Sequence, residues 1–183
     1  TYVGAAGGNW SNPANWAVTG NLTQTGVLPN LSNVALAIIP TGTTAVANAA
    51  TGYTGKIQLA GTLRVANDSY LGAAPGSVTA DLITIDGGTF NATENFTLHA
   101  NRGITLTSNG GTFQVNASKS LNYEGVIQGT GGLTKSGTGT FTLTGTSTGQ
   151  NTLAALIADN TGATSITKTG TGTWVLSNAG NSY

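Results

Sequence analysis

Few side chains of this 183-residue chain could take part in acid–base chemistry, because it has only six Asp or Glu, six Lys or Arg and one His. A glycosidase needs two carboxyl groups on one face of its cleft. The residues that could form such a set are Asp81, Asp86, Glu94, Arg102 and Glu124. Asp81 and Asp86 are five apart, so they point to opposite faces of an unbroken strand. We therefore expect no catalytic residues and a chain that is not an enzyme.

Metal and cofactor sites are equally poorly supported. His99 is the single histidine, which excludes a two-His metal site, and we place it on an outward face. The absence of Cys excludes thiolate sites and disulfides. Asp68 and Asp159 lie in turns rich in Asn, Gly and Ser, where capping of backbone amides is the expected role and calcium binding the alternative. We expect no cofactor and no metal.

The charge pattern argues against a nucleic-acid partner. The net charge is zero, and the basic residues are scattered singly, which predicts solvated positions and no nucleic-acid partner. These residues are Lys56, Arg64, Arg102, Lys119, Lys135 and Lys168. No run of about 18 apolar residues occurs, so we expect no membrane span.

A repeated tripeptide, Gly-Thr-(Leu/Phe/Trp), organises the chain. Its five glycines are Gly61, Gly88, Gly111, Gly139 and Gly172, and its apolar residues are Leu63, Phe90, Phe113, Phe141 and Trp174. Successive copies are 27, 23, 28 and 33 residues apart, and a fainter copy begins at Gly42. We interpret each interval as one coil of a β-solenoid, in which a coil buries its apolar face by stacking on the next.

Short runs with a two-residue apolar period accompany these copies and predict half-buried strands. The apolar residue of each copy should point inward. Its glycine should occupy a corner that requires a positive φ, or a place where neighbouring coils leave no room for a Cβ. The sequence thus predicts an all-β, single-domain solenoid of about six to eight coils.

Two C-terminal stretches carry a resemblance. Gly131–Gly145 reads GGLTKSGTGTFTLTG and Ser165–Ser177 reads SITKTGTGTWVLS. They closely resemble the autotransporter-associated, or passenger-associated, β-strand repeat of bacterial surface and secreted proteins, and the resemblance covers roughly residues 57–183. It implies a parallel β-helix, right-handed, that is exported across a bacterial envelope and has no catalytic residues to transfer.

Residues 1–40 differ from the repeats at 41–183 and contain Trp10 and Trp16. We interpret this stretch as a segment that caps the first coil, because an uncapped solenoid exposes backbone donors and acceptors. The two Trp side chains pack in the core under this interpretation. The alternative is a platform on which sugars stack.

Two functions from different classes follow. The first is a structural extracellular or cell-surface protein that builds a fibre or filament. This prediction rests on the full-strength repeat near Tyr183, which is followed by no cap and should stack on adjacent repeats or on another copy. The second is an adhesin passenger segment that binds glycans or a host surface. Filament formation by the isolated chain would favour the structural function. Glycan binding that is lost in Trp10→Ala or Trp16→Ala would favour the adhesin.

Overall fold

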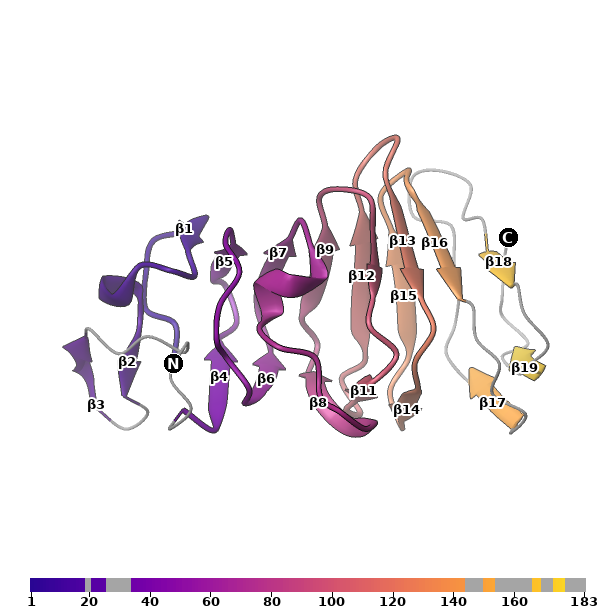
Figure 1. Ribbon diagram of the computed structural model, residues 1–183, viewed down its shortest axis with the longest axis horizontal. Coiled ribbons are helices and arrows are strands. Elements are labelled where there is room, and N and C mark those ends of the chain that lie inside the picture. The colour runs from indigo at the N-terminus through magenta and orange to yellow at the C-terminus, as the bar shows by residue number, and fades with distance from the viewer. Residues whose placement is uncertain (19–20, 26–33, 144–149, 154–165, 169–172, 177–183) are drawn as a thin grey trace.

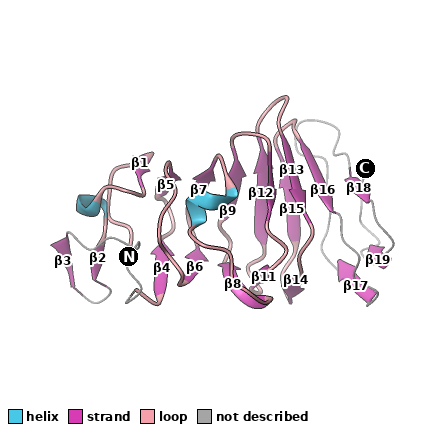
Figure 2. Cartoon of the chain, viewed as in Figure 1, coloured by secondary structure: helices cyan, strands magenta, loops and turns pink. Residues whose placement is uncertain are grey.

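Parallel strands stacked in successive coils make up the protein (Figure 1). The computed structural model describes residues 1–18, 21–25, 34–143, 150–153, 166–168 and 173–176. Almost no helix is present in these ranges, only the short 3-10 turns η1 (Pro13–Asn15) and η2 (Asp68–Leu71), which Figure 2 colours cyan. The prediction of an all-β solenoid with parallel strands is confirmed.

Three parallel sheets form the walls of the solenoid. Sheet I contains β4 (Leu36–Ile39), β6 (Lys56–Leu59), β8 (Thr79–Ile85), β11 (Arg102–Leu106) and β14 (Ile127–Gly129). Sheet II contains β1 (Gly8–Asn9), β5 (Thr44–Ala47), β7 (Thr62–Val65), β9 (Thr89–Ala92), β12 (Gly111–Val115) and β15 (Leu133–Ser136). Sheet III contains β10 (Phe96–Leu98), β13 (Ser120–Tyr123), β16 (Thr140–Leu143) and β18 (Ile166–Lys168).

The chain passes from sheet I to sheet II in every coil and reaches sheet III only from the third coil onward. About five coils lie in the described residues, against the six to eight expected for the whole chain. Two further strand pairs complete the description. They are the antiparallel β2 (Ala17–Val18) and β3 (Asn21–Thr25), and the parallel β17 (Gln150–Leu153) and β19 (Thr173–Leu176).

The core consists of inward columns in which each side chain lies above its counterpart one coil away. The alternation of apolar and polar residues explains this arrangement, because in-register parallel pairing brings like positions together. In sheet II one column is Ala45, Leu63, Phe90 and Phe113, and in sheet I one column is Ala37, Ile57, Ile83, Ile104 and Ile127. All of these side chains are buried.

The repeat copies occupy two sheets. Those at Gly61, Gly88 and Gly111 accompany β7, β9 and β12, with Thr62, Thr89 and Thr112 in register. The copy at Gly139 precedes β16, which lies in sheet III and pairs with β13.

The expectation that each interval is one coil is therefore wrong at the fourth copy. The strand that follows β12 in sheet II is β15, and Thr134, 22 residues after Thr112, is the partner in register. Trp174 lies in β19, which pairs with β17, and Gly172 lies outside the described residues.

Of the two roles predicted for the repeat glycines, the lack of room for a Cβ occurs at Gly88, and the positive φ belongs instead to the residue before it. In the glycine pairs Gly87-Gly88 and Gly110-Gly111, the first residue has a left-handed conformation, with a φ of +75° at Gly87 and +71° at Gly110. The second residue, Gly88, has no such φ. A Cβ there would lie 2.5 Å from the carbonyl oxygen of Leu59 and 2.6 Å from that of Gly61, so the neighbouring coil leaves room only for glycine.

Three buried tyrosines form a repeated corner of sequence Tyr-x-Gly. In each, the hydroxyl donates to the carbonyl oxygen three residues later: Tyr2 to Ala5 at 2.9 Å, Tyr53 to Lys56, and Tyr123 to Val126 at 2.9 Å. At two of the corners the glycine allows this close approach, since a Cβ on Gly55 would lie 2.6 Å from the Tyr53 hydroxyl and one on Gly125 would lie 2.5 Å from the Tyr123 hydroxyl. Each corner thus satisfies a backbone carbonyl with a hydroxyl from the core.

Candidate functional site

The acidic residues considered for catalysis lie in separate contacts. Asp81 pairs with Lys56 at 2.6 Å, and both side chains are 49% exposed. Asp86 accepts hydrogen bonds from the Thr107 hydroxyl at 2.5 Å and from Asn109 at 2.7 Å. β8 also carries a register irregularity opposite Arg102–Ile104, so alternation does not run unbroken from Asp81 to Asp86.

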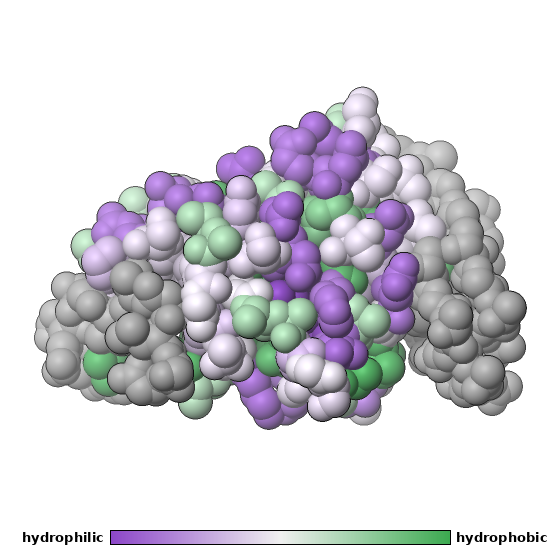
Figure 3. Space-filling view, in the orientation of Figure 1, coloured by the Kyte–Doolittle hydropathy of each residue, from purple (hydrophilic) through white to green (hydrophobic). Residues whose placement is uncertain are grey.

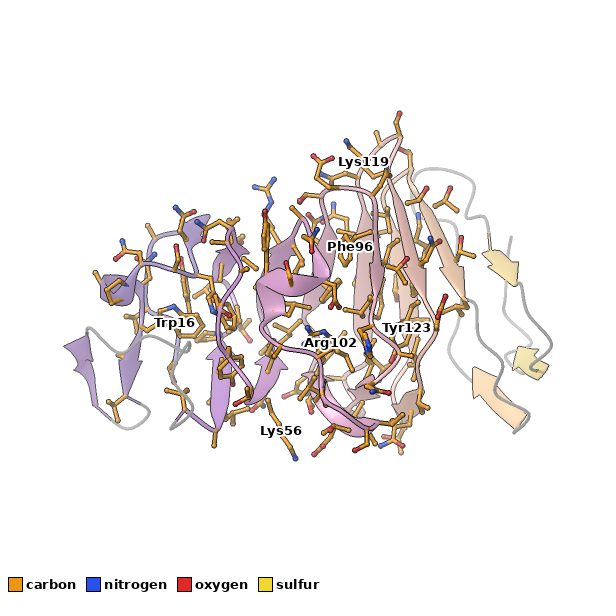
Figure 4. All side chains as sticks on the ribbon, in the orientation of Figure 1. Trp16, Lys56, Phe96, Arg102, Lys119 and Tyr123 are labelled. Atoms are coloured by element: carbon orange, nitrogen blue, oxygen red, sulfur yellow. The ribbon has the colours of Figure 1, made fainter. Side chains whose placement is uncertain are left out.

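The remaining two acids of that set are equally separate. Glu94 pairs with Lys119 at 2.5 Å, and Glu124 is exposed. Figure 4 shows Lys56 and Lys119 at opposite edges of the solenoid.

These contacts keep the two Asp carboxylates in the ionised form. The hydrogen bond from Lys56 lowers the pKa of Asp81, and the hydrogen bonds from Thr107 and Asn109 lower the pKa of Asp86. A general acid at neutral pH needs a raised pKa. In the part of the chain that the structure describes, no group of three or more His, Asp or Glu side chains could hold a metal ion.

Among the side chains that the structure describes, two basic ones are buried, and the expectation that all basic residues are solvated is wrong for these two; the side chain of Lys168 lies outside the described residues. Arg102 is 2% exposed and Lys135 is 5% exposed. Lys135 takes the inward place above Phe113, and its Nζ donates to the carbonyl oxygen of Gly137 at 2.6 Å. Burial lowers the pKa of Lys135. Lys56 and Arg64 are exposed, as expected.

Arg102 binds a segment that is remote in sequence. Its Nε donates to Asp68 Oδ1 at 2.8 Å, and its Nη2 donates to Asp68 Oδ2 at 3.1 Å and to the Gly72 carbonyl oxygen at 2.6 Å. The backbone N–H of His99 also donates to Asp68 Oδ1, at 2.9 Å. The His99 side chain is exposed, as predicted. Asp68 thus caps a backbone amide, and in addition it neutralises a buried guanidinium.

The two tryptophans near the N-terminus lie inside the core. Trp10 is 1% exposed and Trp16 is 2% exposed, with their ring centroids 4.6 Å apart in an edge-on arrangement. Trp16 also contacts Tyr2, and Trp10 contacts Tyr53 of the solenoid. This packing leaves neither ring face open to a sugar. The Nε1 of Trp16 donates to the Trp10 carbonyl oxygen at 2.8 Å, while the Nε1 of Trp10 is buried without a hydrogen-bond partner.

The N-terminal residues cover one end of the stacked sheets. β1 pairs in parallel with β5, Trp10 N–H donates to the Val46 carbonyl oxygen at 2.6 Å, and Tyr2 N–H donates to that of Ile38 at 2.8 Å. Both sheet I and sheet II therefore receive backbone hydrogen bonds from this segment. β4, although it lies within residues 1–40, is itself the first strand of sheet I.

The outer surface is polar and built in rows. Thr44, Thr62, Thr89, Thr112 and Thr134 occupy equivalent register positions in five successive strands of sheet II. An amide contact joins two coils beside this row, where Asn91 donates to Asn116 at 3.2 Å. Hydrophilic and neutral residues cover most of the coloured part of the face in Figure 3. Among the described side chains, the exposed large apolar residues are Val18, Leu36 and Val78.

No helix in the described part of the chain has the length and apolarity required to cross a membrane. Sequence inspection missed two features of the site, the Arg102–Asp68 contact and the tyrosine corners. The corners had a signal, since Tyr-x-Gly recurs at Tyr2, Tyr53 and Tyr123. The ion pair had none, because its two members are 34 residues apart.

Comparison with known proteins gives one curated relative. This relative is the adhesin BmaC autotransporter of Brucella suis biovar 1 (strain 1330), and this chain is 37% identical to it over 94 residues, which are 51% of this chain. The matched stretch is 2% of that protein, so this chain spans only a small part of its relative's length. No family profile matches, and no solved structure matches.

Proposed function

We propose that this chain is a segment of the solenoid shaft of a bacterial surface or secreted adhesin, in which stacked coils form a rod that holds binding regions away from the cell. The supporting observation is the set of in-register columns that run through the coils of sheets I and II. A coil of this kind buries its apolar side chains only against its neighbours, so its stability and its shape both come from continued stacking.

Contacts between coils support the same role. Lys56 and Asp81 are 25 residues apart, and so are Glu94 and Lys119, and each ion pair joins one coil to the next. Exposed ion pairs contribute little free energy, about 0–1 kcal/mol each. Their role here is to fix the register of adjacent coils, which a long rod requires. The similarity to an autotransporter adhesin supports a location outside the cell.

End-to-end assembly into a filament is the second proposal. Successive coils present the same hydrogen-bonding edges in sheets I and II, so coils of another copy could extend these columns with the same kind of contact. The N-terminal cap limits this route, because β1 already pairs with β5 and Tyr2 already donates to Ile38. A second copy would have to pair with the outer edge of β1 or displace it.

Direct adhesion by this segment is the third proposal. The row of threonines on sheet II offers hydroxyl groups at a regular spacing of about 4.8 Å, the separation of neighbouring strands. A neutral glycan or a host-surface protein could bind across this row. The buried Trp10 and Trp16 would contribute to such binding only through the stability of the fold.

Four measurements on the purified chain separate these proposals. Scattering and electron microscopy at rising concentration report shape and assembly, and binding to host-cell monolayers and to a glycan array reports adhesion. Elongated monomers without binding support the shaft. Long fibres support the filament, and binding that is lost when Thr62, Thr89 and Thr112 are changed together to Val supports direct adhesion. A compact particle without the elongated profile would contradict all three.

A further inference from the structure

Sheet III begins later than the other two sheets. Its first strand is β10, in the third coil, whereas sheets I and II already have strands in the first coil. Among the described strands, none pairs with the edge of β10 that faces the second coil. An open strand edge is a template for pairing with another chain, and proteins usually cover it.

Residues 66–78, which we call the strap, lie in the place of the missing strand. The strap connects β7 to β8 and contains η2, which contacts both β10 and β7. It runs over the surface near Arg102 in Figure 4. Of its residues, Leu71 is buried and Val78 is exposed. The strap is thus a non-strand segment placed beside a strand edge.

Residues 99–102, just after β10, hold the strap. The His99 N–H donates to Asp68 Oδ1 at 2.9 Å, and Asn101 Nδ2 donates to the Pro75 carbonyl oxygen at 2.7 Å. Arg102 adds its bonds to Asp68 and Gly72. Hydrogen bonds with an ionised partner are stronger than neutral ones, so the Arg102–Asp68 contact carries most of this attachment.

We propose that the strap is a releasable cover over a strand-acceptor site, and that, once the straps are released, the edge of β10 pairs with the same edge of β10 in a second copy of this chain. The proposal is independent of the function proposed above. It identifies residues 66–78 as the device that keeps this edge from self-association.

The strands already in sheet III identify the occupant. β10 pairs with β13 on its other edge, and β13 pairs with β16, with Phe96, Leu121 and Phe141 in register. The next apolar column holds Leu98, Tyr123 and Leu143. In a folded copy β13 and β16 already have a partner strand on each edge, so the strand that a second copy can offer is its own β10, which carries the same apolar–polar–apolar pattern. The formal net charge of zero also means that two copies do not repel each other strongly.

The two members of the ion pair differ in burial, which decides the variant to use. The Arg102 side chain is 2% exposed and that of Asp68 is 22% exposed. Loss of Asp68 would leave a buried cation without its counter-ion, which is strongly destabilising. Arg102→Met removes that cation and retains apolar volume, while the remaining carboxylate can be hydrated. Arg102→Met is therefore the releasing variant, and Lys56→Gln, in the exposed pair with Asp81, is its matched control.

Hydrogen exchange and molar mass test the proposal together. In Arg102→Met we expect the amides of residues 66–78 and of His99 to exchange faster by roughly ten- to a hundredfold, the range for loss of a charged hydrogen bond. We also expect the molar mass measured by light scattering to rise from monomer to dimer with concentration. Wild type and Lys56→Gln should stay monomeric, with slow exchange at His99.

Two results would overturn the proposal: a folded Arg102→Met with fast strap exchange that stays monomeric, or one whose strap exchange is unchanged. If the variant does not fold, wild type serves instead, in denaturant below its global transition, with a peptide of residues 94–99 that contains β10. Protection of the protein's β10 amides by the peptide, and none by a peptide with Phe96 and Leu98 changed to Ser, supports the proposal. Equal protection by both peptides, or by neither, contradicts it.

Discussion

Phe113 and Phe141 stack almost face to face, with ring centroids 4.8 Å apart and 9° between the ring planes, although β12 and β16 belong to different sheets. Phe90, one coil earlier, lies 5.5 Å from Phe113 at a tilt of 38°. The aromatic repeat residues therefore connect sheet II to sheet III inside the solenoid. This stack, rather than a single column of one sheet, is what the later Gly-Thr-Phe copies build.

A double-mutant cycle on this pair should show coupling. We expect Phe113→Leu and Phe141→Leu each to lower the free energy of unfolding by about 1 kcal/mol, with a coupling of about 0.5–1.5 kcal/mol between them, because the contact between the rings is lost only once. Urea unfolding of the four proteins measures it. Ile57→Val, two coils away, should add to Phe113→Leu within about 0.5 kcal/mol. Additivity of the two Phe variants would contradict the stack.

Gly88→Ala should destabilise the protein by about 1–3 kcal/mol, the usual cost of overpacking, because its Cβ would meet the carbonyl oxygens of Leu59 and Gly61. Gly76→Ala is the matched control, since nothing lies within 4 Å of its Cβ and its φ is not positive. We expect this control to be neutral or more stable by up to about 1 kcal/mol. Thermal unfolding of both variants measures the difference. Equal midpoints would show that the coils can move apart at Gly88.

The tyrosine corners should make the fold sensitive to alkali. Burial raises the pKa of Tyr53 and of Tyr123. Below about pH 10 both hydroxyls are protonated in the folded and the unfolded chain, and above it the unfolded chain alone loses these protons, so stability falls as the pH rises. The double variant Tyr53→Phe, Tyr123→Phe should be about 1–3 kcal/mol less stable at neutral pH, from two lost hydrogen bonds.

Urea unfolding of this double variant between neutral pH and about pH 11 checks the expectation. Its stability should decline less with pH than that of wild type. Phe113→Leu, which removes no ionisable group, should decline as wild type does. A double variant that declines as steeply as wild type would show that other groups cause the alkaline loss.

Replacement of the buried Lys135 by an apolar residue should leave the free energy of unfolding nearly unchanged or raise it. Its ammonium lies inward above Phe113, with a hydrogen bond to the Gly137 carbonyl oxygen. Its lowered pKa means that the unfolded chain binds this proton more tightly, so the cation opposes folding at neutral pH and less so as the pH approaches the ordinary lysine value. We expect Lys135→Met to change stability by between zero and about +1 kcal/mol at pH 7.

Chemical unfolding at pH 7 measures this change, and Lys119→Met, in a half-exposed ion pair with Glu94, is the control, with an expected change within about 0.5 kcal/mol. A loss of more than about 2 kcal/mol in Lys135→Met would show that the hydrogen bond to Gly137 outweighs the burial of the charge.

Local periodicity predicted most of the architecture. The inward positions of Leu63, Phe90 and Phe113 follow from alternation, and the crowding at Gly88 follows from the position of glycine before each strand. The sheet to which a strand belongs could not be predicted. Phe141 ends the same tripeptide as Phe113 but lies in sheet III, and the sequence does not show this difference because strands of all three sheets share one apolar pattern.

The roles of single charged residues were also beyond prediction. Arg102 resembles a solvated residue in sequence, since Asp68 lies 34 positions before it and only the coil geometry brings them together. Lys135 looks equally ordinary until its register partner, Phe113, is known. Pairing between residues that are distant in sequence decides whether a charged side chain is buried, and a local sequence pattern does not show that pairing.

The direction of the ladder hydrogen bonds has a mechanical consequence. Because the strands lie across the long axis and stack along it, these bonds point along the axis and stand one behind another, coil after coil (Figure 1). A pulling force along the axis therefore loads them in series, and the weakest coil opens first. The coil from Thr89 to Thr112 would release 23 residues, roughly 80 Å of extended chain at about 3.5 Å per residue. A tether of such coils would lengthen stepwise under shear and absorb work at each step.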